Sequence, residues 1–180
     1  MRRRDLAGIL LTPSLLAALQ HAHDATTKPG EAKLTYFDPA AAAEVEALAA
    51  QIIPSDGTPG AKEAGVIFFI DRALSTFDRD LQPAYRDGMA LVQAKRRELF
   101  PASTSVASLK DVEAESLVRA IEKTDFFDTL RAHTLMGFLG HPSHGGNRAT
   151  AGWKLIGFED RHGFQPPFGY YDDPKNGDLG

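Results

Sequence analysis

Apolar residues recur at helical spacing along the middle of the chain. The first stretch follows Asp38, which can cap a helix, and Pro39, which fits a first helical turn. Its apolar positions fall on one helical face: Val45, Leu48, Ala49 and Ile52. The pattern predicts a helix that begins at Pro39 and stops before Pro54.

A second apolar run, from Val66 to Ile70, could form a short strand or a buried helix. The alanine, lysine and glutamate residues before it and the Asp71-Arg72 pair after it favour the helix. Residues 82–99 predict a clearer helix, which Pro101 ends, with its polar QAKRRE sequence facing solvent. The apolar face of this helix holds Tyr85, Met89, Val92 and Leu99.

Two more helices are expected before residue 140. Ser108 and Asp111 resemble a capping box at the start of the first. The apolar side of that helix holds Leu109, Val112, Leu117 and Ile121. In the second helix, one stripe holds Phe126, Leu130, His133 and Gly137.

From Gly140 onward regular structure is expected to fade, because glycine, proline and aromatic residues dominate. The chain shows no internal repeat and no strand alternation of useful length. The sequence therefore predicts an all-α protein, a small helical bundle with a long irregular C-terminal segment. Its 180 residues suit one domain, expected at residues 36–160, between an N-terminal segment at 1–25 and an extended tail at 161–180.

The first 25 residues have the composition of an export signal. Arg2, Arg3 and Arg4 precede an apolar run from Leu6 to Leu19, which is shorter than the roughly 20 residues that cross a bilayer. The RRRDLAG sequence is similar to the twin-arginine type of signal, which a receptor recognises. An amphipathic first helix is the alternative, because no clear A-x-A cleavage site follows.

Composition excludes several functional classes. The net charge is -4 and no basic stripe is present, which argues against nucleic-acid binding. The absence of cysteine excludes disulfides, a thiol nucleophile, thiolate zinc sites and an iron–sulfur cluster held by this chain. The chain also lacks the Gly-x-Gly-x-x-Gly fingerprint of a nucleotide-binding turn.

Three of the six histidines are close in sequence, at His133, His141 and His144. They could hold zinc, but no His-x-x-x-His pair lies on a predicted helix and no glutamate is placed as a hydrolytic base. Ser143 beside His144 lacks the strand–turn–helix context of a nucleophile elbow. His133 is expected to pack inside the bundle and bond a carbonyl. Gly137 is expected to let another chain segment pack tightly against its helix.

The segment after residue 140 favours contacts with protein. Gly145 and Gly146 permit left-handed turns or close chain approach, and Asn147 tolerates the same conformations. A phosphate cradle formed by the HGGN sequence is the weaker alternative. Trp153 and its apolar neighbours must pack on the domain or on a partner. The aromatic tail at 164–172 suits a segment that lies across its own domain or another protein.

Two stretches of the chain resemble the gluconate 2-dehydrogenase subunit 3 family, whose members accompany large FAD-dependent dehydrogenases of sugars and sugar acids. The first stretch comprises Ile52-Ile53-Pro54, Asp56, Thr58-Pro59-Gly60-Ala61, Ala64-Gly65-Val66 and Phe69-Ile70-Asp71. The second comprises His133-Thr134, Gly137-Phe138, Pro142, Gly145-Gly146-Asn147 and Gly152-Trp153-Lys154-Leu155-Ile156-Gly157. The chain departs from the family at His141, where an aspartate is common, so any contact made by that aspartate is in doubt.

The resemblance implies a non-catalytic small subunit with no cofactor, metal or catalytic residue of its own. It would act as a chaperone and translocation escort for a large flavoprotein subunit, which would hold FAD, and a cytochrome c subunit could belong to the same complex. The twin-arginine route would place it in the periplasm, with membrane contact only through export or the signal helix. The alternatives are a stand-alone periplasmic helical protein and a His-based metal enzyme.

The partner surface expected from these two lines of argument centres on the second stretch and the tail. Its candidate residues are His133, Gly137, Phe138, Pro142, Gly145, Gly146, Asn147, Trp153, Phe168 and Tyr170.

Overall fold

The computed structural model describes residues 33–161 and residue 163. This part of the chain contains six α-helices and no strand, which confirms the all-α prediction. The helices are α2 (Pro39–Ile52), α3 (Val66–Ser75), α4 (Gln82–Leu99), α5 (Asp111–Ile121), α6 (Asp125–Leu139) and α7 (Ala151–Ile156). Four short 3-10 turns separate them: η1 (Arg79–Leu81), η2 (Val106–Ser108), η3 (Pro142–His144) and η4 (Arg148–Thr150). The predicted export signal and the tail with Phe168 and Tyr170 lie outside the described residues.

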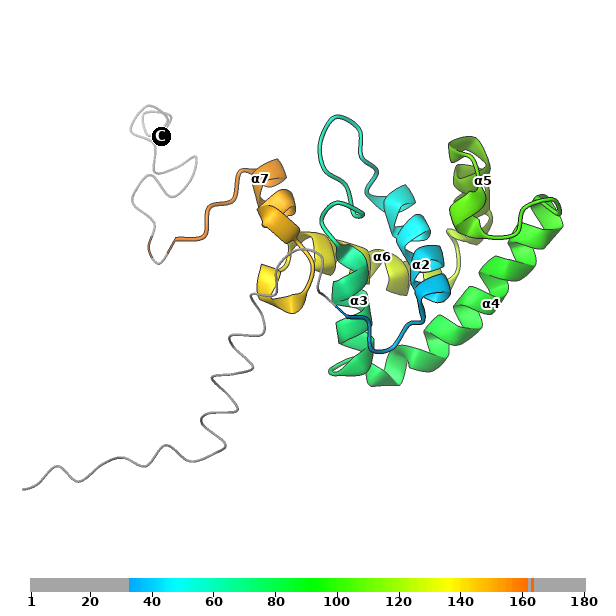
Figure 1. Ribbon diagram of the computed structural model, residues 1–180, viewed down its shortest axis with the longest axis horizontal. Coiled ribbons are helices and arrows are strands. Elements are labelled where there is room, and N and C mark those ends of the chain that lie inside the picture. The colour runs from blue at the N-terminus through cyan, green and yellow to red at the C-terminus, as the bar shows by residue number, and fades with distance from the viewer. Residues whose placement is uncertain (1–32, 162, 164–180) are drawn as a thin grey trace, which may run out of the picture.

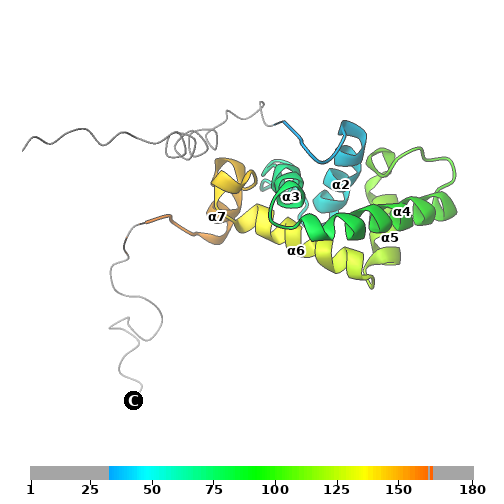
Figure 2. The same ribbon diagram turned by 90° about the horizontal axis from the view of Figure 1, so that it is seen from below.

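Helix α6 runs along the length of the bundle (Figure 1, Figure 2). Helices α2 and α3 pack against each other and against α6, while α4 and α5 form one end of the bundle. Helix α7 lies at the opposite end, where it contacts α6. None of the helices within the described range is long and apolar enough to span a membrane.

The core forms where the apolar faces of α2, α3, α5 and α6 meet. Its completely buried aliphatic side chains include Val45, Leu48, Ile70, Leu74, Leu117, Ile121 and Leu130. Burial of each such side chain stabilises the fold by roughly 1.5–3 kcal/mol before the entropy of ordering the chain is subtracted. The helical periodicity of the sequence therefore identified most of the residues that hold the bundle together.

Side-chain caps begin helices α2 and α6. The carboxylate of Asp38 accepts a hydrogen bond from the Ala41 N–H at 2.8 Å, and Pro39 occupies the first turn of α2, as predicted. The hydroxyl of Thr124 accepts from the Phe127 N–H at 3.2 Å at the start of α6. These bonds satisfy N–H groups that have no partner inside their helices.

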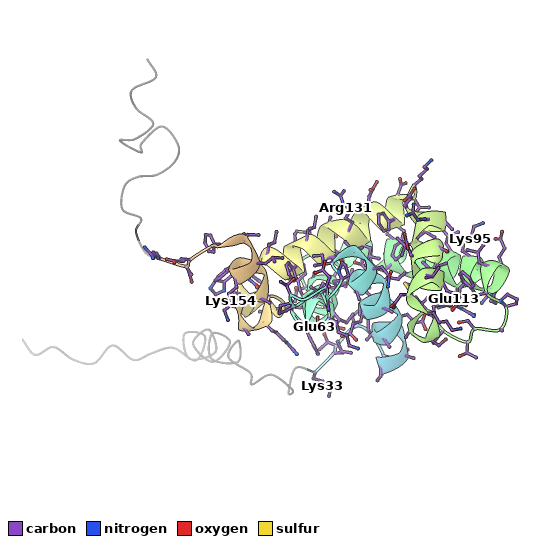
Figure 3. The ribbon with its side chains drawn as sticks, turned by 90° about the horizontal axis from the view of Figure 1, so that it is seen from above. Lys33, Glu63, Lys95, Glu113, Arg131 and Lys154 are labelled. Atoms are coloured by element: carbon purple, nitrogen blue, oxygen red, sulfur yellow. The ribbon has the colours of Figure 1, made fainter. Side chains whose placement is uncertain are left out.

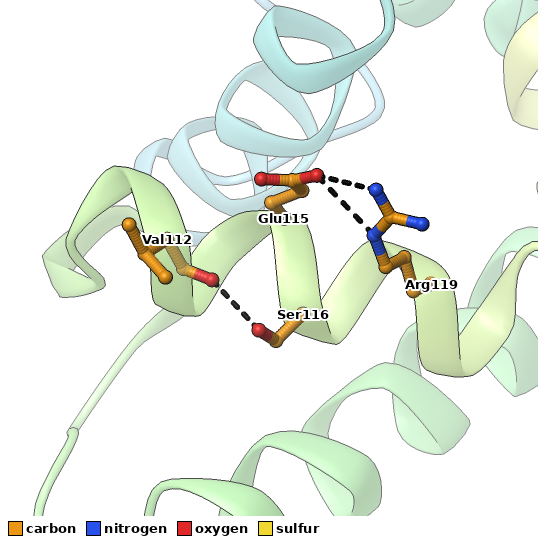
Figure 4. A network of polar contacts seen from close by, with 4 residues as sticks. All are labelled: Val112, Glu115, Ser116 and Arg119. Carbon is orange, nitrogen blue, oxygen red and sulfur yellow. Dashed lines mark hydrogen bonds and ion pairs between the residues drawn. The ribbon is translucent and has the colours of Figure 1, made fainter.

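The predicted capping box of Ser108 and Asp111 is wrong. Ser108 closes the η2 turn, where its backbone N–H bonds the hydroxyl of Ser105 at 3.1 Å, and α5 begins only at Asp111. Val112, predicted on the apolar side, is 75% exposed on the outer surface of α5 (Figure 4). The buried residues of α5 are Ala114, Leu117 and Ile121.

Helix α4 and the C-terminal segment differ from the prediction at three points. Leu99 is 42% exposed, whereas Arg96, predicted to be solvated within QAKRRE, is buried. Its guanidinium donates to Gln93 Oε1 at 2.9 Å and to the carbonyl oxygen of Ser103, so its polar atoms have partners. Regular structure also continues beyond Gly140, in η3, η4 and α7.

Candidate functional site

The segment between α6 and α7 packs directly on the α6 backbone. A side chain at Gly146 would collide with the carbonyl oxygen of Gly137, and one at Gly152 would collide with that of Phe138. At Gly137 itself, an added Cβ would lie 3.0 Å from Cβ of Phe69 on α3. The prediction that Gly137 admits a tightly packed neighbour is therefore confirmed, and the neighbours are Gly146 and Phe69.

Asn147 connects the end of α6 to the start of α7. Its backbone is left-handed, with φ of 46°, and its side chain is completely buried. The side-chain amide donates to the carbonyl oxygen of Gly140 at 2.9 Å, and its oxygen accepts from the Gly152 N–H at 2.9 Å. The Gly145-Gly146-Asn147 stretch thus builds a fixed corner that positions α7.

Trp153 is partly exposed on α7 and contacts both the end of α6 and the loop that follows it. Its indole N–H donates to the carbonyl oxygen of Leu139 at 2.7 Å, and its ring contacts His141 and Phe158 at centroid distances of 5.6 and 5.1 Å. The Nδ1 atom of His141 accepts from the Ser143 N–H at 3.2 Å. His141 thus caps the η3 turn, the role that a short acidic side chain commonly takes.

His133 lies in the core and is only 2% exposed. Its Nδ1 atom is 2.9 Å from the Tyr85 hydroxyl, and its Nε2 atom is 3.2 Å from a carboxylate oxygen of Asp78. A neutral imidazole satisfies both contacts if Tyr85 donates to Nδ1 and Nε2–H donates to Asp78. Burial of His133 is confirmed, but the expected carbonyl partner is wrong, since its partners are a hydroxyl and a carboxylate.

Burial lowers the pKa of His133 below its ordinary value of 6.5, although Asp78 acts in the opposite direction. The unfolded chain then binds a proton more readily than the folded chain below pH 6.5. We expect the free energy of unfolding to fall as pH falls below this value, with His133 contributing a slope of at most about 1.4 kcal/mol per pH unit.

Urea denaturation between pH 7.5 and 4.5 measures this slope, and the His133→Gln protein is the reference. The contribution of His133 and its contact with Asp78 is the difference between the two slopes, because the other carboxylates affect both proteins alike. Identical slopes would show that His133 does not titrate differently in the folded and unfolded chains.

Asp71 is the last residue of the first stretch that resembles the family, Ile52 to Asp71. It was not identified as a functional residue from the sequence. It is 3% exposed, and its two carboxylate oxygens accept from the backbone N–H groups of Thr35, Tyr36 and Phe37 at 2.8–2.9 Å. The Thr35 hydroxyl adds a fourth bond at 2.9 Å. The carboxylate therefore holds the segment before α2 against α3.

Large apolar side chains are exposed at the α7 end of the bundle. We call the α6–α7 apolar surface the set Leu135, Met136, Leu139, Leu155, Ile156 and Phe158, which are 37–60% exposed. The bond from Trp153 to Leu139 and the contact of Trp153 with Phe158 connect its two helices. Exposed apolar side chains on two helices that contact each other are candidates for a surface that another molecule covers.

The structure divides the predicted partner-surface residues into three groups. Five are buried and can only shape the surface from beneath: His133, Gly137, Phe138, Gly146 and Asn147. Pro142, Gly145 and Trp153 are partly exposed, and Phe168 and Tyr170 lie outside the described residues. Whether a partner contacts any of them stays a prediction.

The alternative of a His-based enzyme required His133, His141 and His144 to converge. His133 bonds Tyr85 and Asp78 in the core, whereas His141 bonds Ser143 and packs on Trp153 at the surface. Among residues 33–161 and 163, no group of three or more histidine, aspartate or glutamate side chains is arranged to hold a metal ion.

These features define a small helical protein with an exposed apolar end that is built on tightly packed glycines. The model of the gluconate 2-dehydrogenase subunit 3 family matches residues 39–160, and the chain belongs to this family. The family name denotes one subunit of a multi-subunit dehydrogenase, which agrees with a small accessory role. Comparisons with curated proteins and with solved structures gave no significant match.

Proposed function

We propose that this chain is the non-catalytic small subunit of an exported FAD-dependent dehydrogenase of the gluconate or glucose type. In this role it stabilises the large flavoprotein subunit and escorts it through the membrane. Family membership over residues 39–160 is the observation that carries this proposal.

The α6–α7 apolar surface supports the proposal from the physical side. Leu155 is 51% and Ile156 is 60% exposed, although each would gain free energy by leaving water. Residues of the second matching stretch, including Gly146, Asn147 and Gly152, hold α7 so that these side chains project outward. A large subunit that covers this surface would bury them.

The chemistry of the complex belongs, in this proposal, to the partner. FAD bound by the large subunit would supply the oxidation of a CH–OH group, and a cytochrome c subunit would accept the electrons. The paired arginines at Arg2, Arg3 and Arg4 support export by the twin-arginine route to the periplasm. A folded, flavin-loaded partner could then travel with the small subunit.

Replacing Leu155 and Ile156 together with serine is expected to weaken binding of the large subunit at least tenfold. Both side chains are more than half exposed, so stability of the isolated subunit should change by only about 0.5 kcal/mol. The measurement is the dissociation constant for the large subunit, obtained with the purified subunits by calorimetry or interferometry.

The matched control is Val112→Ser. Val112 is also apolar and 75% exposed, but it lies on α5 at the other end of the bundle. It should bind the large subunit as the wild type does. If the wild type and the Leu155/Ile156 variant bound the large subunit with equal affinity, the α6–α7 apolar surface would not be part of the interface.

A further inference from the structure

Arg148 is held in place beside the N-terminal end of α3. Its backbone N–H donates to the carbonyl oxygen of Ala64 at 2.9 Å. Its guanidinium carbon lies 3.8 Å from the centroid of the Phe68 ring, in the geometry of a cation–π contact. The stacking restricts a side chain that is otherwise among the most flexible.

Gly65 makes room for this side chain. A Cβ atom at Gly65 would lie 2.6 Å from both Cδ and Nε of Arg148, so any other residue type here would displace the Arg148 side chain from this position. The backbone of Gly65 is also left-handed, with φ of 66°. Glycine at this position therefore serves both the start of α3 and the placement of Arg148.

The backbone around Arg148 is strained. Asn147, Ala149 and Thr150 all have left-handed conformations, with φ of 46°, 54° and 55°. Such a conformation is unfavourable for alanine and more so for β-branched threonine. Strain of this kind persists only where surrounding contacts impose it, and it is concentrated at sites of binding and catalysis.

The guanidinium of Arg148 has no hydrogen-bond acceptor and no ion-pair partner within the part of the chain that the structure describes. Partial burial lowers its pKa, and the charge of Glu46 on α2 only partly offsets this effect. A half-buried cation without a paired anion gains from an added carboxylate, since a guanidinium can donate two parallel hydrogen bonds to it.

The charge of the surrounding sequence favours an acidic partner. Between Asp128 and Glu159 the chain has no aspartate or glutamate but contains Arg131, Arg148 and Lys154, although its net charge is -4. Figure 3 shows Lys154 at the α7 end of the bundle and Glu113 at the opposite end. A partner that approaches the α7 end therefore meets Arg148 and Lys154, with no carboxylate of this segment before Glu159.

We propose that Arg148, stacked on Phe68 in the space left by Gly65, binds a side-chain carboxylate of the large subunit. This inference rests on the proposed function and adds to it a specific polar contact with the same partner. An arginine presented by an aromatic ring is typical of interface positions that contribute much of the binding free energy.

The first test compares Arg148→Gln with Arg119→Gln in binding to the purified large subunit. Arg119 is an exposed arginine on α5, paired with Glu115 at 2.7 Å (Figure 4), so its replacement changes the net charge equally. We expect Arg148→Gln to raise the dissociation constant at least tenfold and to reduce its salt dependence. The Arg119→Gln protein should bind as the wild type does.

The second test locates the carboxylate. In the Arg148→Lys protein, a carbodiimide can couple the new amine to a carboxylate in contact with it, and mass spectrometry identifies the joined peptides. We expect residue 148 to be joined to an aspartate or glutamate of the large subunit. This test does not depend on the stability of the Arg148→Gln protein.

The outcomes separate this inference from the proposed function. If the wild type binds the large subunit but Arg148→Gln binds equally well, the inference fails and the proposed function stands. Cross-links from residue 148 only to this chain, for example to Glu46, would also overturn it. If the wild type does not bind the large subunit at all, both fail.

Discussion

The Gly146→Ala protein is expected to lose about 3 kcal/mol of stability. The new Cβ would collide with the carbonyl oxygen of Gly137, and both colliding groups belong to fixed backbone. Neither can move aside by a rotamer change, so the corner built by Asn147 must separate from α6. Urea denaturation followed by circular dichroism measures the loss.

Gly163→Ala is the matched control, because a Cβ at Gly163 meets no atom within 4 Å. Its stability should equal that of the wild type to within about 0.5 kcal/mol. The Gly146→Ala protein should also bind the large subunit more weakly, since α7 is no longer held in position. A fully stable Gly146→Ala protein would show that the close contact with Gly137 is absent in solution.

The Asp71→Ala protein is expected to be destabilised by about 3 kcal/mol or more. The buried carboxylate accepts four hydrogen bonds, three of them from the backbone N–H groups of residues 35–37. Removing it leaves these donors without their acceptor and detaches the segment before α2 from α3. Denaturation midpoints and the rate of proteolysis around residues 33–38 both report the change.

Asp71→Asn and Asp87→Ala provide the comparison. Asparagine keeps the shape and one acceptor oxygen, so its loss should be intermediate, whereas Asp87 is exposed on α4 and its replacement should be nearly neutral. If Asp71→Ala were as stable as Asp87→Ala, the hydrogen bonds to Thr35, Tyr36 and Phe37 would not hold the segment in place.

The helices were predictable because their apolar faces repeat with helical periodicity. Leu130 and His133 on α6 and Val45 and Leu48 on α2 are buried as the spacing indicates. Val112 was placed incorrectly because it lies in the first turn of α5, which begins at Asp111 and not directly after Ser108, whose side chain belongs to the η2 turn. Local signals of similar chemistry, a few residues apart, cannot be ranked without their tertiary contacts.

Features of the site could be predicted from sequence where the residue type alone determines the packing. Gly137 indicated close packing because only glycine lacks a side chain. The partners of His133 could not be predicted, since Tyr85 and Asp78 lie 48 and 55 positions away in the sequence. Arg148 and Asp71 were missed for the same reason, because their roles depend on Phe68 and on residues 35–37.

The most direct test of the account is the behaviour of the wild-type chain when it is co-produced with the large flavoprotein subunit. Affinity-purified material is analysed by size-exclusion chromatography with light scattering, flavin absorbance and a sugar-oxidation assay. We predict one complex that contains both chains, with its flavin in the large subunit, and an isolated small subunit without flavin or activity. Separate elution of the two chains, or a small subunit that alone binds flavin and oxidises a sugar, would contradict the account.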